Sequence, residues 1–246
     1  MGFYNKADDE QILAEIRVIL SVRSSYGYKR VTAMLNKRRS ETTRYNRKRI
    51  YRLMKKSGLV LPKNKQVRVH SGTGKVMTLR SNTRWCSDCF EIRCFNDERV
   101  HVGFSLDCSD REVISYVFDV LPLTKEHIET LMIESVFKRF GKWKTDRQIE
   151  WLTDRGSIYR SPKTQQTAKI IGLKSCFTAP YSPASNGMAE SLVHTIKRDY
   201  VYVSDCSTAQ EVIKMLPSWF YDYNSEAPHS ALGMKSPLEF RKICCY

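Results

Sequence analysis

The hydrophobic positions near the N-terminus recur with the period of about 3.6 residues that marks amphipathic helices. Residues 10–20 place isoleucine and leucine on one stripe, and residues 29–37 continue the pattern after a Tyr-Gly-Tyr break. A third helix is predicted over 46–56, begun by the capping residue Asn46 and ended by Gly58. Three short helices with a basic third one are typical of a helix-turn-helix, although a small helical bundle with a charged exterior has the same spacing.

Residues 61–83 have no apolar period. They are rich in Pro, Gly, Ser, Thr and Lys, which is typical of a linker. From residue 84 the pattern changes, and apolar runs predict strands over 85–92, 100–106 and 113–120. The later predicted elements are a helix from Thr124 to Gly141, short strands at 149–153 and 174–179, and helices at 162–171, 187–203 and 208–223.

Three consecutive strands, a helix and then strands alternating with helices predict an α/β fold, a mixed sheet flanked by helices. The predicted domains are therefore a small all-α, helix-turn-helix-like domain over 1–60, a basic linker over 61–83 and a larger domain over 84–246. A chain of 246 residues accommodates such a pair of domains. It has no apolar run of the roughly 18 residues that a membrane span needs and no signal peptide, so the expected location is the cytoplasm.

The net charge of +15 is distributed unevenly. Residues 1–84 carry 21 Lys and Arg against 5 Asp and Glu, whereas residues 85–246 carry 20 against 21. A concentrated positive field favours a polyanion, and nucleic acid is the commonest such partner. We expect the linker to lie on DNA when DNA is present. The side chains expected to face phosphates or a groove are Arg44, Arg47, Lys48, Arg49 and Arg52.

Cys86 and Cys89 form a C-x-x-C sequence, which raises zinc or redox chemistry. Side chains alternate along a strand, however, so these two thiols are expected on opposite faces. The sequence has no second C-x-x-C or H-x-x-x-H to supply further ligands. We therefore expect the cysteines to be reduced core thiols.

Three acidic residues occupy positions where an isolated charge is costly. Asp88 lies inside an apolar strand, Asp154 follows the strand 149–153, and Glu190 lies just inside a helix. Clustered carboxylates repel one another, and divalent cations such as Mg²⁺ or Mn²⁺ remove that conflict. Two such ions about 3.5–4 Å apart can promote phosphodiester displacement. Asp107 and Asp110, at the end of the second strand and in the next turn, are alternative first ligands.

The acidic residues lie in motifs that resemble those of bacterial insertion-sequence transposases of the retroviral-integrase type. Asp154 and Glu190 have 35 residues between them, which is the spacing of that family. The resemblance covers residues 10–242. The segments that carry it are W-x-x-D at 85–88, L-T-D-x-G-S at 152–157, Y-S-P-x-S-N-G-M-A-E at 181–190, Y-N-x-x-x-P-H-S-A-L-G-x-x-S-P at 223–237, and the N-terminal Y-G-Y-K-R-V and I-Y-R-L-M-K-K-S-G-L.

The resemblance implies a ribonuclease H-like core in which Asp88, Asp154 and Glu190 are the catalytic residues and the ligands of Mg²⁺ or Mn²⁺, with two ions. It implies DNA cleavage followed by joining of the released end to a target, with no covalent protein–DNA intermediate. The implied partners are double-stranded DNA at element ends and target, further copies of the chain on that DNA, and an upstream helix-turn-helix protein that such elements often encode. We therefore expect the protein at the nucleoid when it is bound to DNA.

Further features refine this expectation. Lys197 is two helical turns after Glu190 and is expected to contact the DNA backbone together with Arg198, whereas His194 on the same face is read as a surface residue. Arg155 stands where the family commonly has Asn, so a cation lies beside a proposed ligand. The alternative functions are a metal-dependent nuclease that cleaves without joining, and a DNA-binding regulator or inactive remnant of a transposase.

Overall fold

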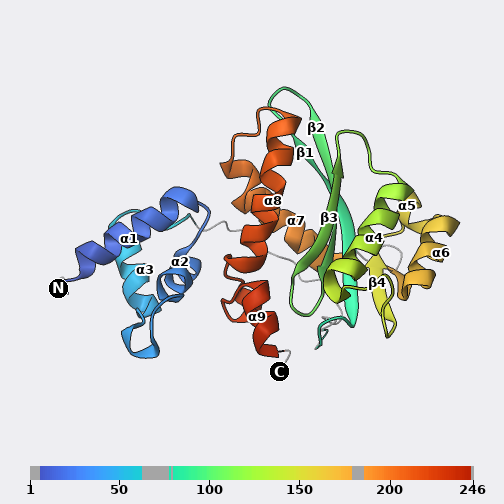
Figure 1. Ribbon diagram of the computed structural model, residues 1–246. Helices are drawn as coiled ribbons and strands as arrows, with labels where there is room; N and C mark the ends of the chain where they lie inside the picture. The colour runs from blue at the N-terminus through green and yellow to red at the C-terminus, as the bar shows by residue number, and fades with distance from the viewer. Residues whose placement is uncertain (1–5, 63–77, 79, 179–185, 245–246) are drawn as a thin grey trace. The chain divides into compact units, whose positions relative to one another are not determined.

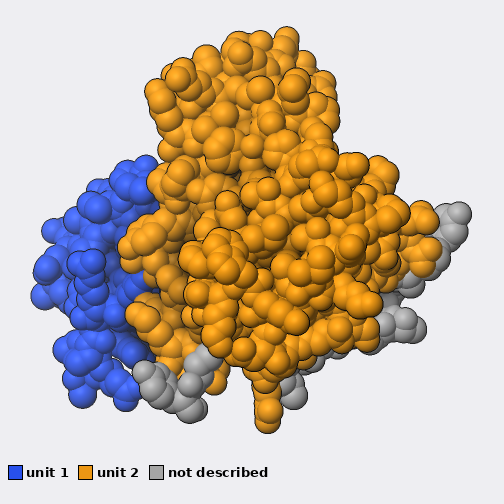
Figure 2. Space-filling view, turned by 45° about the vertical axis from the view of Figure 1, so that its right-hand side comes forward, with its two compact units in different colours: residues 1–70, 227–236 blue, residues 71–226, 237–246 orange. Residues whose placement is uncertain are grey.

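The computed structural model describes residues 6–62, 78, 80–178 and 186–244. Most of the predicted linker therefore lies outside the described residues. The chain forms two compact units, one of residues 1–70 with 227–236 and one of residues 71–226 with 237–246 (Figure 2).

The first unit is a small helical domain (Figure 1). Its helices are α1 (Asp9–Val22), α2 (Tyr28–Asn36), the 3-10 turn η1 (Glu41–Thr43), α3 (Arg47–Lys56) and the 3-10 turn η4 (Ser230–Leu232). The three predicted helices are confirmed. The Asn46 side chain accepts a hydrogen bond of 2.8 Å from the backbone N–H of Lys48, and Gly58 adopts the left-handed conformation, with φ +69°.

The apolar stripes of these helices meet in one core. Ile12 and Ile16 of α1 pack with Val31 of α2 and with Ile50 and Met54 of α3, and all five are fully buried. The segment 227–236 joins this unit through Arg30, whose Nε donates to the carbonyl of Pro228 at 3.3 Å. The sequence pattern gave no sign of that long-range contact.

The second unit contains a five-stranded mixed sheet in the order β3-β2-β1-β4-β5. β1 pairs with β2, and β2 with β3, in antiparallel fashion, whereas β1–β4 and β4–β5 are parallel. The strands are β1 (Arg84–Arg93), β2 (Arg99–Asp107), β3 (Val113–Asp119), β4 (Ile149–Thr153) and β5 (Leu173–Phe177). All five strands were predicted from the apolar pattern, with small differences at their ends.

Helices cover both faces of this sheet (Figure 1). α7 and α8 bury residues such as Leu192 and Leu216 against one face, and α4 and α6 bury residues such as Leu131 and Ala168 against the other. The helices of this unit are α4 (Lys125–Phe140), α5 (Ser157–Arg160), α6 (Pro162–Ile171), α7 (Gly187–Asp199), the 3-10 turn η3 (Val201–Val203), α8 (Ala209–Ser225) and α9 (Pro237–Cys244).

Two helices of this unit were not predicted. α5 lies between the strand predicted at 149–153 and the helix predicted at 162–171, and α9 follows the two helices expected to close the chain. The predicted helix 187–203 is also shorter, since α7 ends at Asp199 and η3 follows. None of the helices within the described residues is long and apolar enough to cross a bilayer.

Candidate active site

The parallel pairing of β1 and β4 places two of the predicted acidic residues at one level of the sheet. Cys86 of β1 is the register partner of Leu152 of β4. Asp88 follows Cys86 by two residues, and Asp154 follows Leu152 by two. Side chains two apart on a strand share a face, so Asp88 and Asp154 project from the same face as Cys86 and Leu152. That face is the one covered by α7 and α8.

Glu190 comes from the helix that covers this face. α7 packs against β1 and buries Ala189, Leu192 and Ile196. Glu190 lies next to buried Ala189 in the first turn of α7 and is exposed. Strand, strand end and helix start therefore supply the three carboxylates from one side of the sheet.

Electrostatics links the three carboxylates. Partial burial, together with the negative charges of Asp154 and Glu190, raises the pKa of Asp88 from its usual 3.8 to about 6, although the hydrogen bond from the Cys89 backbone N–H lowers it. Neither a lysine nor an arginine forms an ion pair with any of the three in the part of the chain that the structure describes. They are half-buried or exposed acids that repel one another.

The carboxylate oxygens of Asp88, Asp154 and Glu190 are suitable ligands for a hard divalent cation. Carboxylate oxygens are what Mg²⁺ and Mn²⁺ prefer, and a cation would offset the repulsion that raises the pKa of Asp88. Over the described ranges, however, no three acidic, histidine or cysteine side chains are gathered closely enough to hold a metal ion. The three carboxylates lie on one face of the sheet and interact electrostatically, but they are not close enough together to hold a metal ion without rearrangement.

Gly156 explains the local form of the D-x-G motif. Its backbone N–H donates to Oδ1 of Asp154 at 2.9 Å and so orients that carboxylate. A Cβ atom at this position would lie 3.0 Å from the same oxygen, closer than ordinary van der Waals contact. A side chain at position 156 would therefore push the Asp154 carboxylate by a few tenths of an ångström from this position.

Tyr159 supports Asp88 from the opposite face of the sheet. Its buried hydroxyl lies 3.1 Å from Oγ of Ser87 and 3.3 Å from Sγ of Cys89, the two neighbours of Asp88 on β1. The residue sits on α5, directly after the Asp154 turn. The sequence interpretation missed it; the available signal was an aromatic residue five positions after Asp154.

Arg155 does not neutralise Asp154. Its exposed side chain donates through Nε to the carbonyl of Thr178 at 3.2 Å, just beyond β5. The departure from the family pattern at this position therefore leaves the carboxylate available.

The alternative first ligand, Asp107, lies in a buried ion-pair cluster separate from the three carboxylates. Its fully buried carboxylate accepts from the backbone N–H of Asn82 at 2.7 Å and from Nε1 of Trp85 at 3.1 Å. Arg139 pairs with Asp107 at 2.9 Å and with Asp110 at 2.8 Å. Asp107 and Asp110 are thus satisfied by a buried arginine, and this cluster anchors the residues that lead into β1.

The predicted DNA-contacting residues of the first unit divide into two groups. Arg44, Arg47 and Lys48 are exposed. Arg49 instead pairs with Asp8 at 2.5 Å and with Asp9 at 2.6 Å, which raises its pKa, and Arg52 pairs with Asp9 at 2.8 Å. Arg49 and Arg52 therefore join α3 to the start of α1.

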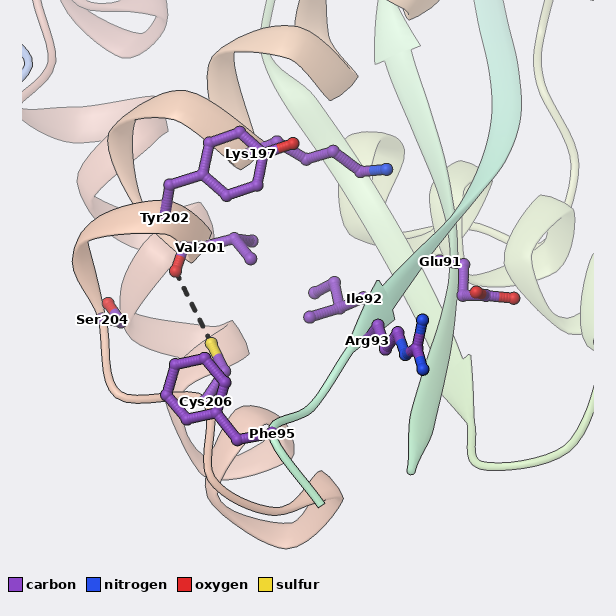
Figure 3. Close-up of a pocket in the computed structure, with 9 residues that line it drawn as sticks. All are labelled: Glu91, Ile92, Arg93, Phe95, Lys197, Val201, Tyr202, Ser204 and Cys206. Atoms are coloured by element: carbon purple, nitrogen blue, oxygen red, sulfur yellow. Dashed lines mark hydrogen bonds between the residues drawn. The ribbon is translucent and has the colours of Figure 1, made fainter. Parts of the chain in front are cut away.

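The two basic residues at the end of α7, Lys197 and Arg198, differ in their ion pairing. Arg198 makes two hydrogen bonds, of 2.6 and 2.8 Å, to the buried carboxylate of Asp199. Lys197 has no ion-pair partner among the described residues and lines a cavity beside β1 (Figure 3). His194 is exposed, consistent with its reading as a surface residue.

The C-x-x-C thiols lie on opposite faces of the sheet, as predicted. Cys86 is buried in the core under α7 and α8, and Cys89 packs toward the core under α4. Cys86 and Cys89 are both free thiols.

Comparisons with known proteins agree with this architecture. Family models described as integrase core domains match residues 78–183 and 171–237, and one described as an HTH-like domain matches residues 6–66. The chain is 41% identical to "Transposase InsD for insertion element IS2A/D/F/H/I/K" of Escherichia coli, over 97% of this chain and 81% of that protein. The chain belongs to the InsD family of insertion-sequence transposases. The InsD transposase of element IS2-9 from Escherichia coli K12 is likewise 41% identical, over 97% of this chain and 79% of that protein.

Solved structures with the same fold are more distant in sequence. The InsD-family chain superposes on a chain of the simian T-cell lymphotropic virus intasome with a TM-score of 0.56 at 13% identity, covering 92% of this chain and 74% of that one. The Mos1 transposase catalytic domain gives a TM-score of 0.52 at 12% identity, covering 99% and 91%. These likenesses establish the ribonuclease H-like fold of the catalytic unit. The protein is thus a transposase with an integrase core and an HTH-like DNA-binding domain.

Proposed function

We propose that this InsD-family transposase cleaves DNA at the ends of a mobile element and joins them to a target, through a metal site formed by Asp88, Asp154 and Glu190. The supporting observation is that the three carboxylates face one side of the sheet, interact electrostatically and have no protein counter-ion among the described residues. Mutual repulsion makes such a set costly unless a cation binds to it.

The proposed ligands are the carboxylate oxygens of these three residues, for Mg²⁺ or Mn²⁺, with two ions. A bound ion would act as a Lewis acid on the phosphodiester and would lower the pKa of an attacking water or hydroxyl. The chain's own contribution is orientation. The Gly156 N–H fixes one oxygen of Asp154, and the Tyr159 hydroxyl bonds to the residues on either side of Asp88.

DNA binding is proposed for the exposed cations of both units. Arg44, Arg47 and Lys48 would contact phosphates from the first unit, with Arg49 and Arg52 contributing chiefly by holding α3 in place. Lys197 and its neighbour Arg198 would contact the backbone near the scissile bond. The division into 1–60, a basic linker 61–83 and a catalytic domain 84–246 is part of the same proposal.

Two element ends must be cut and joined in one event, so we propose that several copies act together on double-stranded DNA, at the bacterial nucleoid. An upstream helix-turn-helix protein of the same element is a proposed partner.

The test is a cleavage and strand-transfer assay on labelled element-end DNA with Mg²⁺. Asp88→Asn, Asp154→Asn and Glu190→Gln should each nearly abolish both reactions while DNA binding persists. Cleavage by wild type without joining would favour a metal-dependent nuclease. Wild type that binds DNA but neither cleaves nor joins it would favour a regulator or an inactive remnant.

A further inference from the structure

A cavity of 490 Å³ lies on the catalytic unit where the end of β1 meets α7 and the turn after it. Its volume falls within the range of roughly 300–1,000 Å³ typical of sites for small organic groups. In Figure 3, Ile92 points toward Val201, whereas Glu91 lies on the other side of β1. The same view places Lys197 and Tyr202 at one end and Phe95 and Cys206 at the other.

Two aromatic rings of this lining are unusually exposed. Phe95 is 76% and Tyr202 75% exposed, so most of each ring is available to another molecule. Isolated exposed apolar residues are common, but here an aromatic ring at each end of one cavity offers a flat face on which a planar group can stack.

Of the charged residues that line the cavity, Lys197 alone forms no ion pair within the described part of the chain. Arg93 is paired with Asp97 at 2.6 Å, and Glu91 with Arg99 at 3.2 Å. Lys197 has no such partner there. The cavity therefore combines aromatic rings, an aliphatic floor and a single ammonium group, which complement a planar base carrying a phosphate.

The cavity shares β1 and α7 with two of the proposed catalytic carboxylates, Asp88 and Glu190. Lys197 and Glu190 share a face of α7 and are two turns apart, roughly 10 Å along the helix axis. A DNA strand at the carboxylates would pass the cavity within a few nucleotides.

We propose that this cavity binds one unpaired nucleotide of the DNA substrate, with its base against Phe95 or Tyr202 and its phosphate at Lys197. The inference rests on the proposed function, because it takes DNA to be the substrate. It adds a subsite for an unpaired base, which the carboxylates do not require. Stacking on aromatic rings tolerates any base, so the site would select an unpaired end or a displaced nucleotide over an intact duplex.

The test is photocrosslinking with iododeoxyuridine, which reacts with aromatic side chains that it contacts. The probes are a short duplex with a single-stranded overhang containing the analogue, in either polarity, and a blunt duplex with the analogue inside. Full-length wild type should crosslink the overhang at Phe95 or Tyr202, as identified by mass spectrometry, and should crosslink the blunt duplex there much less. Crosslinks confined to other residues, or equal for both probes, would overturn the proposal.

Affinity supplies a second readout. Replacing the aromatic residue that crosslinks, by Phe95→Leu or Tyr202→Leu, should weaken binding of the overhang probe by about 5-fold or more, in line with about 1–3 kcal/mol for one stacked base, and should leave blunt-duplex binding unchanged. The matched control is Tyr221→Leu, which alters a 69% exposed tyrosine on α8 outside the cavity. If the cavity variants instead change only self-association, the surface is a contact between copies of the chain and the proposal is wrong.

These readouts do not require catalysis. Crosslinking at the cavity combined with full activity of the carboxylate variants would contradict the proposed function alone. Metal-dependent cleavage without crosslinking at the cavity would contradict the nucleotide subsite alone.

Discussion

The hydroxyl of Tyr159 lies 3.1 Å from Oγ of Ser87 in the core of the catalytic unit. Through this contact and the 3.3 Å contact to Cys89, one side chain from the segment after Asp154 holds both neighbours of Asp88. The segment that follows Asp154 is therefore joined to the neighbours of Asp88, and these contacts lie on the face of the sheet opposite to the two carboxylates.

Tyr159→Phe should keep the buried ring and lose these contacts. We expect a stability loss of about 1 kcal/mol and a fall in cleavage rate of about 10-fold, as for other residues that orient ligands. The Mn²⁺ concentration for half-maximal cleavage should also rise, which a purely structural defect would not cause. Tyr116→Phe, a half-buried tyrosine on β3, is the control. Unchanged Mn²⁺ dependence in Tyr159→Phe would show that the hydroxyl has no positioning role.

Asp88 should make the metal-free protein less stable at neutral pH. Because its folded-state pKa is about 6 rather than 3.8, folding favours the protonated carboxyl. That contribution is complete below pH 3.8 and is lost as the pH rises through 6. Asp88→Asn should therefore stabilise the metal-free protein at pH 8, by on the order of 1–2 kcal/mol after allowance for partial solvent exposure. Thermal unfolding in chelator at pH 8 and pH 4 checks this; a gain that is equal at both values would contradict it.

Arg139 should be essential for stability rather than for metal binding. Its side chain is 1% exposed and pairs with the fully buried carboxylates of Asp107 and Asp110. Arg139→Met would leave buried negative charge without a partner, at a cost of about 3–5 kcal/mol. Burial and Asp107 already raise the pKa of Asp110 to about 6, so acidification through that value should recover part of the loss. Urea unfolding at two pH values measures both effects. A decrease in the free energy of unfolding of less than about 1 kcal/mol would contradict a stabilising role of the Arg139 ion pairs.

The basic residues of α3 should separate by function. Arg49→Ala should lower the melting temperature of the helical unit, because Arg49 pairs with Asp8 and Asp9. Arg47→Ala should leave the melting temperature unchanged and weaken DNA binding, with a salt dependence shallower by about one phosphate contact. If Arg47→Ala binds DNA as well as wild type at every salt concentration, α3 is not the DNA-binding face.

Elements with strong local signals were predictable from the sequence. Helix α4 begins after Thr124, which forms a capping box, and ends at Gly141, which adopts the left-handed conformation. Gly172 ends α6 in the same left-handed conformation. These residues determine the backbone next to themselves, so their effect is visible in a short stretch of sequence. α9 was not predicted, although Ser236, Pro237 at the first helical position and Glu239 in the first turn form a helix-start signal. It contacts α8, and its Arg241 pairs with Glu112, a residue 129 positions away.

The candidate site was predictable only in part, for the same reason. Spacing and motif led to the prediction of Asp88, Asp154 and Glu190 as site residues, and the strand register explains why Asp88 and Asp154 lie at one level of the sheet. The inward pairing of Arg49 and the turn of Arg155 toward Thr178 depend on partners distant in the sequence. Charge composition alone could not show which protein groups these two arginines contact.

Metal binding tests the central claim most directly. Electron paramagnetic resonance of free Mn²⁺ counts the ions bound by wild type, Asp154→Asn and the control Asp146→Asn, which alters an exposed aspartate paired with Lys142. If the three carboxylates form one metal site, Asp154→Asn should lose Mn²⁺ binding that Asp146→Asn retains in full. Equal binding by wild type and Asp154→Asn would contradict a metal site at these residues.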